Sequence, residues 1–444
     1  MRITDNAVFR RLGGASLCLA TLAAAQAVLP QIAQAQSSDG VVTYRMEAGD
    51  TLHSIDDDFM SGRNAIAAIA RINRISNPHR IPVGTVIRLP RNLLAWRDAG
   101  LKIRSFNGPV TIDGVAAQNE MAFEEGAVIR TGANGFVTLR SDDGAIVSLP
   151  SNSHARLERS RIYSLRNLRD VEFRILGGRG SVEAPTLRSE ERFRTSTPVA
   201  VTAVRGTEYR VAYDEASGLS LSEVIEGTVS VEQDAAAQIA NEGFGVAATD
   251  AGIGDLEELL PPVEIAEPTA TQTGEVVSFA LSLPEGAIGA RTELATDVTF
   301  NEIVADDVSD DGVATFEGLA DGRYQVRSRP ISATGIEGLS EEDSFRRKRL
   351  GAEAAVEASP ISDGFRFVWQ AQGEGATHFA FQLWQQGAGD TPLFDEIALP
   401  GSATVITGLE AGTYVWRMAA IQSDQEDGLL KVWGPEQTLT VPPE

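Results

Sequence analysis

The sequence is poor in the side chains that most often bind metals or attack substrates. It has one cysteine in 444 residues, Cys18, and four histidines. His53, His79, His154 and His378 are not spaced as a set of metal ligands. Cys18 lies in a segment that we expect to be removed, so no cysteine remains for a disulfide or a nucleophile. We therefore expect no disulfide framework, no metal and no cofactor.

Long apolar runs are absent after the N-terminus. Three arginines precede an apolar stretch rich in Ala and Leu, and Ala33-Gln34-Ala35 follows as a small-x-small cleavage pattern. This pattern predicts a signal peptide over residues 1–35, a mature chain beginning at Gln36 and a periplasmic or secreted protein. A membrane anchor is the competing interpretation, but glycine and polar residues dilute the apolar stretch below what a stable span needs.

Basic residues are scarce in the C-terminal half. Residues 235–444 contain 11 basic and 35 acidic residues, which accounts for the whole formal net charge of −24. Nucleic acid and anionic lipid both require a surface rich in Lys and Arg, so neither is expected as a partner. The acidic surface is explained most simply as a solvated face that keeps an exported protein soluble.

The remaining composition predicts a mainly β protein of three or four domains. Short alternating runs punctuated by glycine dominate the chain. The predicted units are a small βααβ module (42–91), an all-β domain (92–235), a linker (236–262) and two C-terminal β-sandwich domains (263–350 and 351–444).

Residues 42–91 show a β-α-α-β pattern. Alternation predicts strands over 42–46 and 83–89, and helical spacing of apolar residues predicts helices from Leu52 and over 64–73. The spelling resembles the LysM domain in these positions: Tyr44-x-Met46-x-x-Gly49-Asp50-Thr51-Leu52-x-x-Ile55, Ile72-Asn73, Asn77-Pro78, Ile81-x-Val83-Gly84 and Ile87-x-Leu89-Pro90.

The LysM resemblance implies binding of N-acetylglucosamine-containing glycan, chiefly peptidoglycan or chitin, in a shallow groove. The implied walls of this groove are Gly49, Asp50, Thr51 and Leu52 on one side and Ile75, Ser76, Asn77, Arg80 and Ile81 on the other. Backbone N–H groups of the first turn would bond acetamido oxygens, while Leu52 and Ile81 would contact the acetyl methyl group. A module that has lost binding and has only a structural role is the alternative.

Residues 92–235 carry a second resemblance. Runs over 136–140 and 145–149 flank Asp142-Asp143-Gly144 and predict a hairpin. Further strands are predicted over 171–175, 180–183, 193–195, 207–212 and 221–231. The segment Thr197-Pro198-Val199-Ala200-Val201-Thr202-Ala203-Val204-Arg205-Gly206-Thr207-Glu208-Tyr209-Arg210-Val211 resembles the FecR domain, the periplasmic portion of a family of bacterial signal-transducing regulators. The cytoplasmic segment and membrane helix of the regulators are not seen before it, so direct control of a sigma factor is not expected.

Charged residues in the FecR-like region allow two interpretations. Arg205 is either a ligand contact or a buttress beside Gly206, whose glycine is expected to supply a conformation closed to other residues. The arginines between 156 and 174 either meet an acidic partner or, as we expect, pair across strands with Glu158, Asp170 and Glu172.

The acidic half contains an internal repeat. Gly318-Leu319-Ala320-Asp321-Gly322-Arg323-Tyr324 recurs as Gly408-Leu409-Glu410-Ala411-Gly412-Thr413-Tyr414, one domain length later. The spelling looks like the tyrosine corner of fibronectin type III-like modules, which predicts that each tyrosine hydroxyl bonds a backbone group a few residues upstream. Four of the five tryptophans fall in the second copy, which predicts a better-supplied aromatic core there.

No arrangement typical of a catalytic nucleophile or of paired carboxylates is found, so no catalytic residue is predicted. We expect a non-enzymatic envelope protein that binds peptidoglycan through the LysM-like module and presents its β domains to an unidentified envelope protein. A signal-sensing component for a membrane receptor and an accessory factor of a wall-remodelling enzyme are the alternatives.

Overall fold

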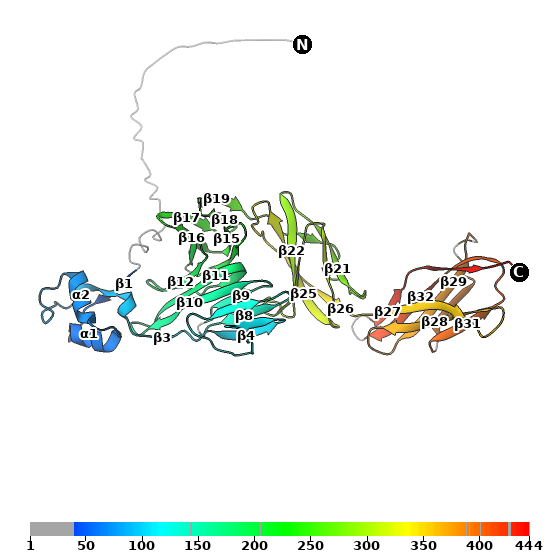
Figure 1. The fold of residues 1–444 in the computed structure, drawn as a ribbon, viewed down its shortest axis with the longest axis horizontal. Coiled ribbons are helices and arrows are strands. Elements are labelled where there is room, and N and C mark those ends of the chain that lie inside the picture. The colour runs from blue at the N-terminus through cyan, green and yellow to red at the C-terminus, as the bar shows by residue number, and fades with distance from the viewer. Residues whose placement is uncertain are drawn as a thin grey trace, which may run out of the picture.

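The structure is a computed structural model that describes residues 40–142, 144–204, 206–387, 389, 391–399, 401–424 and 428–443. The predicted signal peptide, Cys18, Asp143 and Arg205 lie outside these residues. The chain is mainly β, as predicted, and its parts follow one another in a row from the βααβ module to the C-terminal sandwich (Figure 1). In the part of the chain that is described, no helix is long and apolar enough to span a membrane.

The N-terminal module has the predicted β-α-α-β order. Its elements are β1 (Val41–Arg45), α1 (Leu52–Phe59), α2 (Ala65–Asn73), β2 (Val86–Pro90) and the short 3-10 helix η3 (Arg91–Leu93). Strands β1 and β2 pair antiparallel, and the apolar faces of both helices pack on them. Strand β2 begins later than predicted because Pro82 to Thr85 form a turn, in which the Thr85 N–H donates to the Pro82 carbonyl at 3.1 Å.

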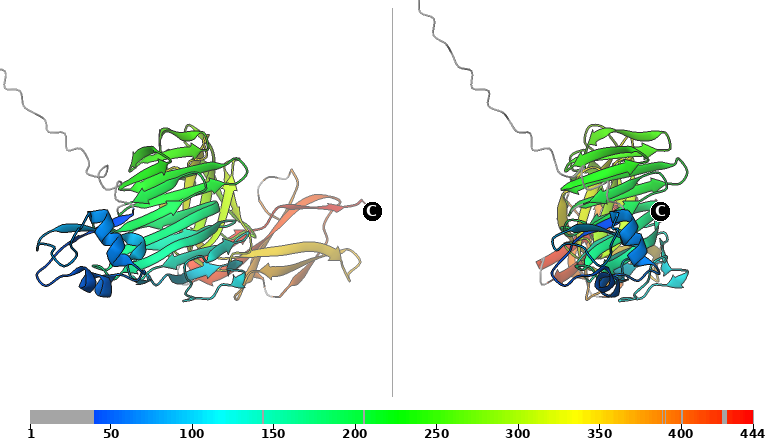
Figure 2. Two further views of the ribbon diagram at one scale, coloured as in Figure 1. Left: turned by 60° about the vertical axis from the view of Figure 1, so that its left-hand side comes forward. Right: turned by 90° about the vertical axis from the view of Figure 1, so that its left-hand side faces the viewer.

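Residues 96–258 form one large β unit of two facing sheets (Figure 2). Its strands are β3 (Trp96–Asp98), β4 (Lys102–Asn107), β5 (Val110–Ile112), β6 (Val115–Ala116), β7 (Val128–Thr131), β8 (Phe136–Arg140), β9 (Ile146–Leu149), β10 (His154–Tyr163), β11 (Leu168–Glu183), β12 (Arg192–Ser196), β13 (Val201–Val204), β14 (Glu208–Asp214), β15 (Leu219–Glu226), β16 (Thr228–Gln233), β17 (Ala236–Asn241), β18 (Phe244–Thr249) and β19 (Gly252–Glu258).

Strand β11 belongs to both sheets. Its first part pairs with β10 and β12, and its second part pairs with β14 and β9. The two sheets enclose a single apolar core that includes Ile129, Leu157, Phe173 and Val224, each almost completely buried. The hairpin predicted around residues 142–144 is confirmed by the pairing of β8 with β9.

Two predictions for this region were wrong. The stretch 236–262, expected to be a linker, forms β17, β18 and β19, which pair with β16 and β15. Its small apolar residues Ala240, Val246 and Ala248 are buried in the common core, so an Ala- and Gly-rich composition here reflects tight packing. The single strand predicted over 221–231 is divided into β15 and β16 at Gly227, whose φ is +88°.

The C-terminal half forms two β-sandwiches of similar layout. The first has β20 (Glu264–Ile265), β21 (Val277–Ser282) and β24 (Val313–Phe316) in one sheet, and β22 (Ala287–Ala295), β23 (Ile303–Ser309), β25 (Gly322–Ser332) and β26 (Glu342–Arg347) in the other. The second has β27 (Gly351–Ala358), β28 (Gly364–Gln372) and β31 (Ala403–Thr407) in one sheet, and β29 (His378–Gln385), β30 (Phe394–Leu399), β32 (Gly412–Asp424), β33 (Gly428–Trp433) and β34 (Gln437–Val441) in the other.

Both predicted tyrosine corners are confirmed. The Tyr324 hydroxyl donates to the Ala320 carbonyl at 3.0 Å, and the Tyr414 hydroxyl donates to the Glu410 carbonyl at 2.9 Å. Both rings are buried. Of the four tryptophans in the last sandwich, only Trp369 and Trp416 lie in its core, so its aromatic supply is smaller than predicted.

Candidate functional site

The two predicted walls of the glycan groove lie close together at one side of the βααβ module. His53, at the start of α1, and His79, in the loop after α2, have ring centroids 6.1 Å apart and nearly parallel planes, 14° apart. Both side chains are exposed. The contact shows that the start of α1 and the 75–81 loop form neighbouring parts of one surface.

The first wall is held rigidly by local hydrogen bonds. The Asp50 carboxylate accepts the Tyr44 hydroxyl at 2.9 Å and the Glu47 N–H at 2.5 Å. Partial burial, together with the hydrogen bond to Asp50 and its charge, raises the pKa of Tyr44 to about 12. Thr51 caps α1: its hydroxyl accepts the Ser54 N–H at 3.0 Å, and its own N–H donates to the Ser54 hydroxyl at 2.9 Å.

Two expected contacts of this first wall need correction. Leu52 is fully buried in the module core, so its side chain cannot contact an acetyl group on the surface. The Thr51 N–H, one of the backbone donors expected for an acetamido oxygen, is already used by Ser54. Helical periodicity predicted the apolar face of α1, and Leu52 belongs to that face because it starts the buried Leu52–Ile55 row. Gly49 remains exposed in the turn.

The second wall is a loop organised by Asn77. Its side-chain oxygen accepts the His79 N–H at 3.0 Å, and its carbonyl accepts the Arg80 N–H at 3.2 Å. Ile75 and Ile81 are half-buried against the module core, while Ser76, Asn77 and Arg80 are exposed. Ile81 therefore keeps an apolar surface that a ligand can reach.

The module is joined to the β unit by a shared core and by buried charges. Tyr163, Leu165 and Leu168, from the β10–β11 hairpin, are buried in the same cluster as Leu52 and Ile69. The linking polar contacts are Arg91 Nη2 to the Glu190 carbonyl (2.7 Å), Arg91 Nη1 to Asp170 (3.7 Å), Tyr163 hydroxyl to Asp170 (3.0 Å) and Thr43 N–H to Glu190 (2.6 Å). The groove is thus attached to a rigid support.

The predicted cross-strand pairing of the arginines between 156 and 174 is confirmed in part. Arg159 lies 3.3 Å from both Asp170 and Glu172 on the neighbouring strand β11. Arg161 instead pairs with Glu125 at 2.7 Å, in the loop before β7. Gly206 has a φ of +91°, and a Cβ there would lie 2.8 Å from the Thr186 Cα, as expected for a position closed to other residues.

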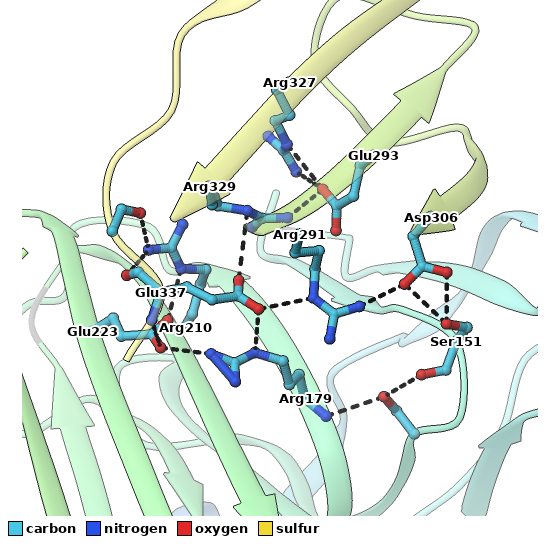
Figure 3. A network of polar contacts seen from close by, with 12 residues as sticks. Ser151, Arg179, Arg210, Glu223, Arg291, Glu293, Asp306, Arg327, Arg329 and Glu337 are labelled. Carbon is cyan, nitrogen blue, oxygen red and sulfur yellow. Dashed lines mark hydrogen bonds and ion pairs between the residues drawn. The ribbon is translucent and has the colours of Figure 1, made fainter. Parts of the chain in front are cut away.

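The sequence gave no indication of a second cluster, which lies between the β unit and the first sandwich (Figure 3). Glu337 contacts Arg179 at 2.9 Å and Arg291 at 2.8 Å. The other ion pairs are Arg210–Glu223 (2.8 Å), Arg179–Glu223 (2.7 Å), Arg291–Asp306 (2.6 Å), Arg327–Glu293 (2.8 Å), Arg329–Glu337 (3.5 Å) and Arg329–Glu293. We call these nine residues the junction network.

The functional residues that sequence reasoning missed are His53, His79 and the junction network. The two histidines are far apart in sequence, and only the folding of α1 against the 75–81 loop joins them. The junction residues occupy outward positions of alternating strands, which a sequence pattern assigns to solvent. Their one available signal was the number of arginines on β22 and β25 in an otherwise acidic half.

Comparison with known proteins follows the geometry. Residues 127–230 match the FecR protein family. No curated protein matches the chain in sequence.

Three solved structures illustrate the similarity in fold. A putative anti-sigma factor from Parabacteroides distasonis is 14% identical, with 30% of this chain and 58% of that chain covered and a TM-score of 0.25. Fibronectin(III)-like modules of Clostridium thermocellum CbhA are 11% identical, with 41% and 94% covered and a TM-score of 0.19. A two-domain fibronectin type III segment of chicken tenascin is 12% identical, with 41% and 100% covered and a TM-score of 0.20.

This chain thus spans little more than half the length of the anti-sigma factor structure. The family match is confined to the β unit, where the FecR-like motif was found in the sequence. The chain therefore contains a FecR domain at residues 127–230.

Proposed function

We propose that the protein is a non-enzymatic component of the cell envelope that binds N-acetylglucosamine-containing glycan of peptidoglycan in the groove between α1 and the 75–81 loop. The observation that carries the proposal is the adjacency of the two walls, marked by the His53–His79 contact. Exposed Gly49, Ser76, Asn77 and Arg80 and half-buried Ile81 supply the polar and apolar surface that a sugar with an acetamido group requires.

The FecR domain and the sandwiches have a different part in this proposal. Buried ion pairs fix the FecR domain to the first sandwich, so the glycan-binding module is attached to an extended, rigid support. Such a support presents a large surface to a second envelope protein at a fixed distance from the wall. The FecR match favours signal sensing as the use of that surface.

The four histidines provide a direct test in the full-length mature protein. We expect titration with N-acetylglucosamine tetrasaccharide to shift the imidazole proton NMR signals of His53 and His79. His154, in the FecR domain, and His378, in the last sandwich, serve as internal controls and should not shift. The dissociation constant should be on the order of micromolar to millimolar, because a shallow groove makes few polar contacts. Unchanged signals, or equal shifts of all four, would contradict the proposal.

A further inference from the structure

The two faces that meet at the junction network do not close completely. A cavity of about 440 Å³ lies between β11 and β14 of the FecR domain and β22 and β25 of the first sandwich. Its volume is within the range of roughly 300–1,000 Å³ that small-molecule sites occupy, and such sites are frequent between domains. The loop between β22 and β23 also borders it, where the Asn301 carbonyl accepts the Ser105 and Thr138 hydroxyls, each at 2.7 Å.

The inner wall of this cavity carries an excess of positive charge. The junction network has five guanidinium groups, those of Arg179, Arg210, Arg291, Arg327 and Arg329, and four carboxylates, those of Glu223, Glu293, Asp306 and Glu337. Glu342 also approaches Arg327, at 3.6 Å, but its side chain is 48% exposed, and solvent screens that contact. A ligand that reaches the inner wall therefore meets a site suited to a carboxylate.

The mouth of the cavity has the opposite character. Glu183 on β11 and Glu208 on β14 are direct cross-strand partners, and both line the cavity. Like charges directly opposite one another destabilise a sheet. Partial burial and the neighbouring Glu208 raise the pKa of Glu183, while Arg104 and Arg327 act in the other direction. Neither carboxylate takes part in the junction network, so a cation placed between them would relieve their repulsion.

We propose that this cavity binds a small zwitterion with a free amino and a free carboxyl group, an amino acid or a short peptide. Its ammonium group would lie between Glu183 and Glu208, and its carboxylate would face the arginine-rich inner wall. Both contacts are charge-assisted hydrogen bonds in a partly desolvated site, the setting in which such bonds are strongest. The site is separate from the glycan groove and does not depend on glycan binding.

The probe for this site is the dipeptide alanylalanine, measured by isothermal titration calorimetry on the full-length mature protein. Two related probes each remove one charge: N-acetyl-alanylalanine lacks the ammonium group, and alanylalanine amide lacks the carboxylate. We expect alanylalanine to bind and each blocked probe to bind about tenfold more weakly or worse, because each loses one charged hydrogen bond. Free leucine, with the same two termini closer together, distinguishes an amino-acid site from a peptide site.

Variants connect any binding to the two carboxylates. The double variant Glu183→Gln/Glu208→Gln should lose alanylalanine binding by about tenfold or more, while its unfolding midpoint should not fall, because like charges have been removed. Glu226→Gln is the matched control, since Glu226 is the exposed cross-strand neighbour of Glu208 on the side away from β11 and is not part of the cavity lining. No detectable binding of alanylalanine and leucine, equal binding of the N-acetyl probe, or wild-type binding by the double variant would overturn the proposal.

Discussion

At the scale of single residues, the junction network makes stability depend on pH. Burial alone would raise the pKa of Glu293, but Arg329 and Arg327 outweigh burial and lower it to about 2 from an ordinary 4.5. A carboxylate whose pKa is lowered by folding stabilises the protein above its unfolded pKa. That contribution is present above about pH 4.5 and is lost as the pH falls toward 2.

We expect the free energy of unfolding to decrease from pH 4.5 to pH 2, and the Glu293→Gln variant to show a weaker decrease. At pH 7 this variant should be less stable by about 3 to 5 kcal/mol, because two buried guanidinium groups lose their partner. Denaturant titrations at several pH values measure both effects. Glu285→Gln, at an exposed glutamate of the same sandwich, is the control and should follow the wild-type curve.

The tyrosine corners give a second residue-scale prediction. Replacing Tyr414 with Phe keeps the buried ring but leaves the Glu410 carbonyl without its partner, which should cost about 1 to 3 kcal/mol. Four of the five tryptophans lie in the last sandwich, so tryptophan fluorescence mainly follows its unfolding. Tyr414→Phe should lower this fluorescence midpoint, and Tyr324→Phe should leave it unchanged. Equal shifts from both variants would mean that the two sandwiches unfold as one unit.

At the scale of elements, the turn before β14 depends on Gly206. An added Cβ there would meet both an unfavourable φ of +91° and the Thr186 backbone at 2.8 Å. Gly206→Ala should therefore cost about 2 to 4 kcal/mol, the sum of a backbone penalty and a steric one. Gly218 has a φ of +68° but no atom near its Cβ position, so Gly218→Ala should cost only about 1 to 2 kcal/mol. Equal losses in thermal unfolding would show that the Thr186 contact does not matter.

Local patterns predicted the elements well where a residue's role is set by its near neighbours in the chain. The βααβ order, the β8–β9 hairpin and both tyrosine corners depend on spacing within about ten residues. The linker prediction failed because a run of Ala and Gly suits a flexible chain and also suits strands packed closely at the end of a core. Leu52 was misassigned because a motif position was taken as a surface position although it begins the buried face of α1.

At the scale of the whole molecule, contacts between units were beyond the reach of the sequence. Arg179, Arg210 and Arg291 each occupy an outward position of a strand, and a single-chain pattern cannot show that two outward faces meet. The same holds for the shared core of the βααβ module and the FecR domain, in which Tyr163 packs beside residues from the N-terminal helices. These contacts join the first three units into one support.

Arg91 tests that support. Its side chain is buried between the module and the FecR domain, 3.7 Å from Asp170 and bonded to the Glu190 carbonyl. Arg91→Ala should lower the free energy of unfolding by about 3 to 5 kcal/mol, because Asp170 stays buried with fewer partners. Hydrogen exchange should accelerate in β1 and β2 as the module loosens. Arg97→Ala, at an exposed arginine of β3, should change neither quantity.

Co-sedimentation with peptidoglycan sacculi tests the central claim most directly. Deleting residues 42–91 would expose the core shared with Tyr163, so point variants of the full-length mature protein are used instead. Wild-type protein should sediment with sacculi without releasing soluble muropeptides, and Ser76→Ala/Arg80→Ala should bind about tenfold more weakly, because two exposed polar groups of the groove are lost. Arg140→Ala, which removes an equal charge from an exposed site on β8, should bind like wild type. Wild-type protein that stays in the supernatant, or a groove variant that sediments as strongly as the Arg140→Ala control, would contradict the account.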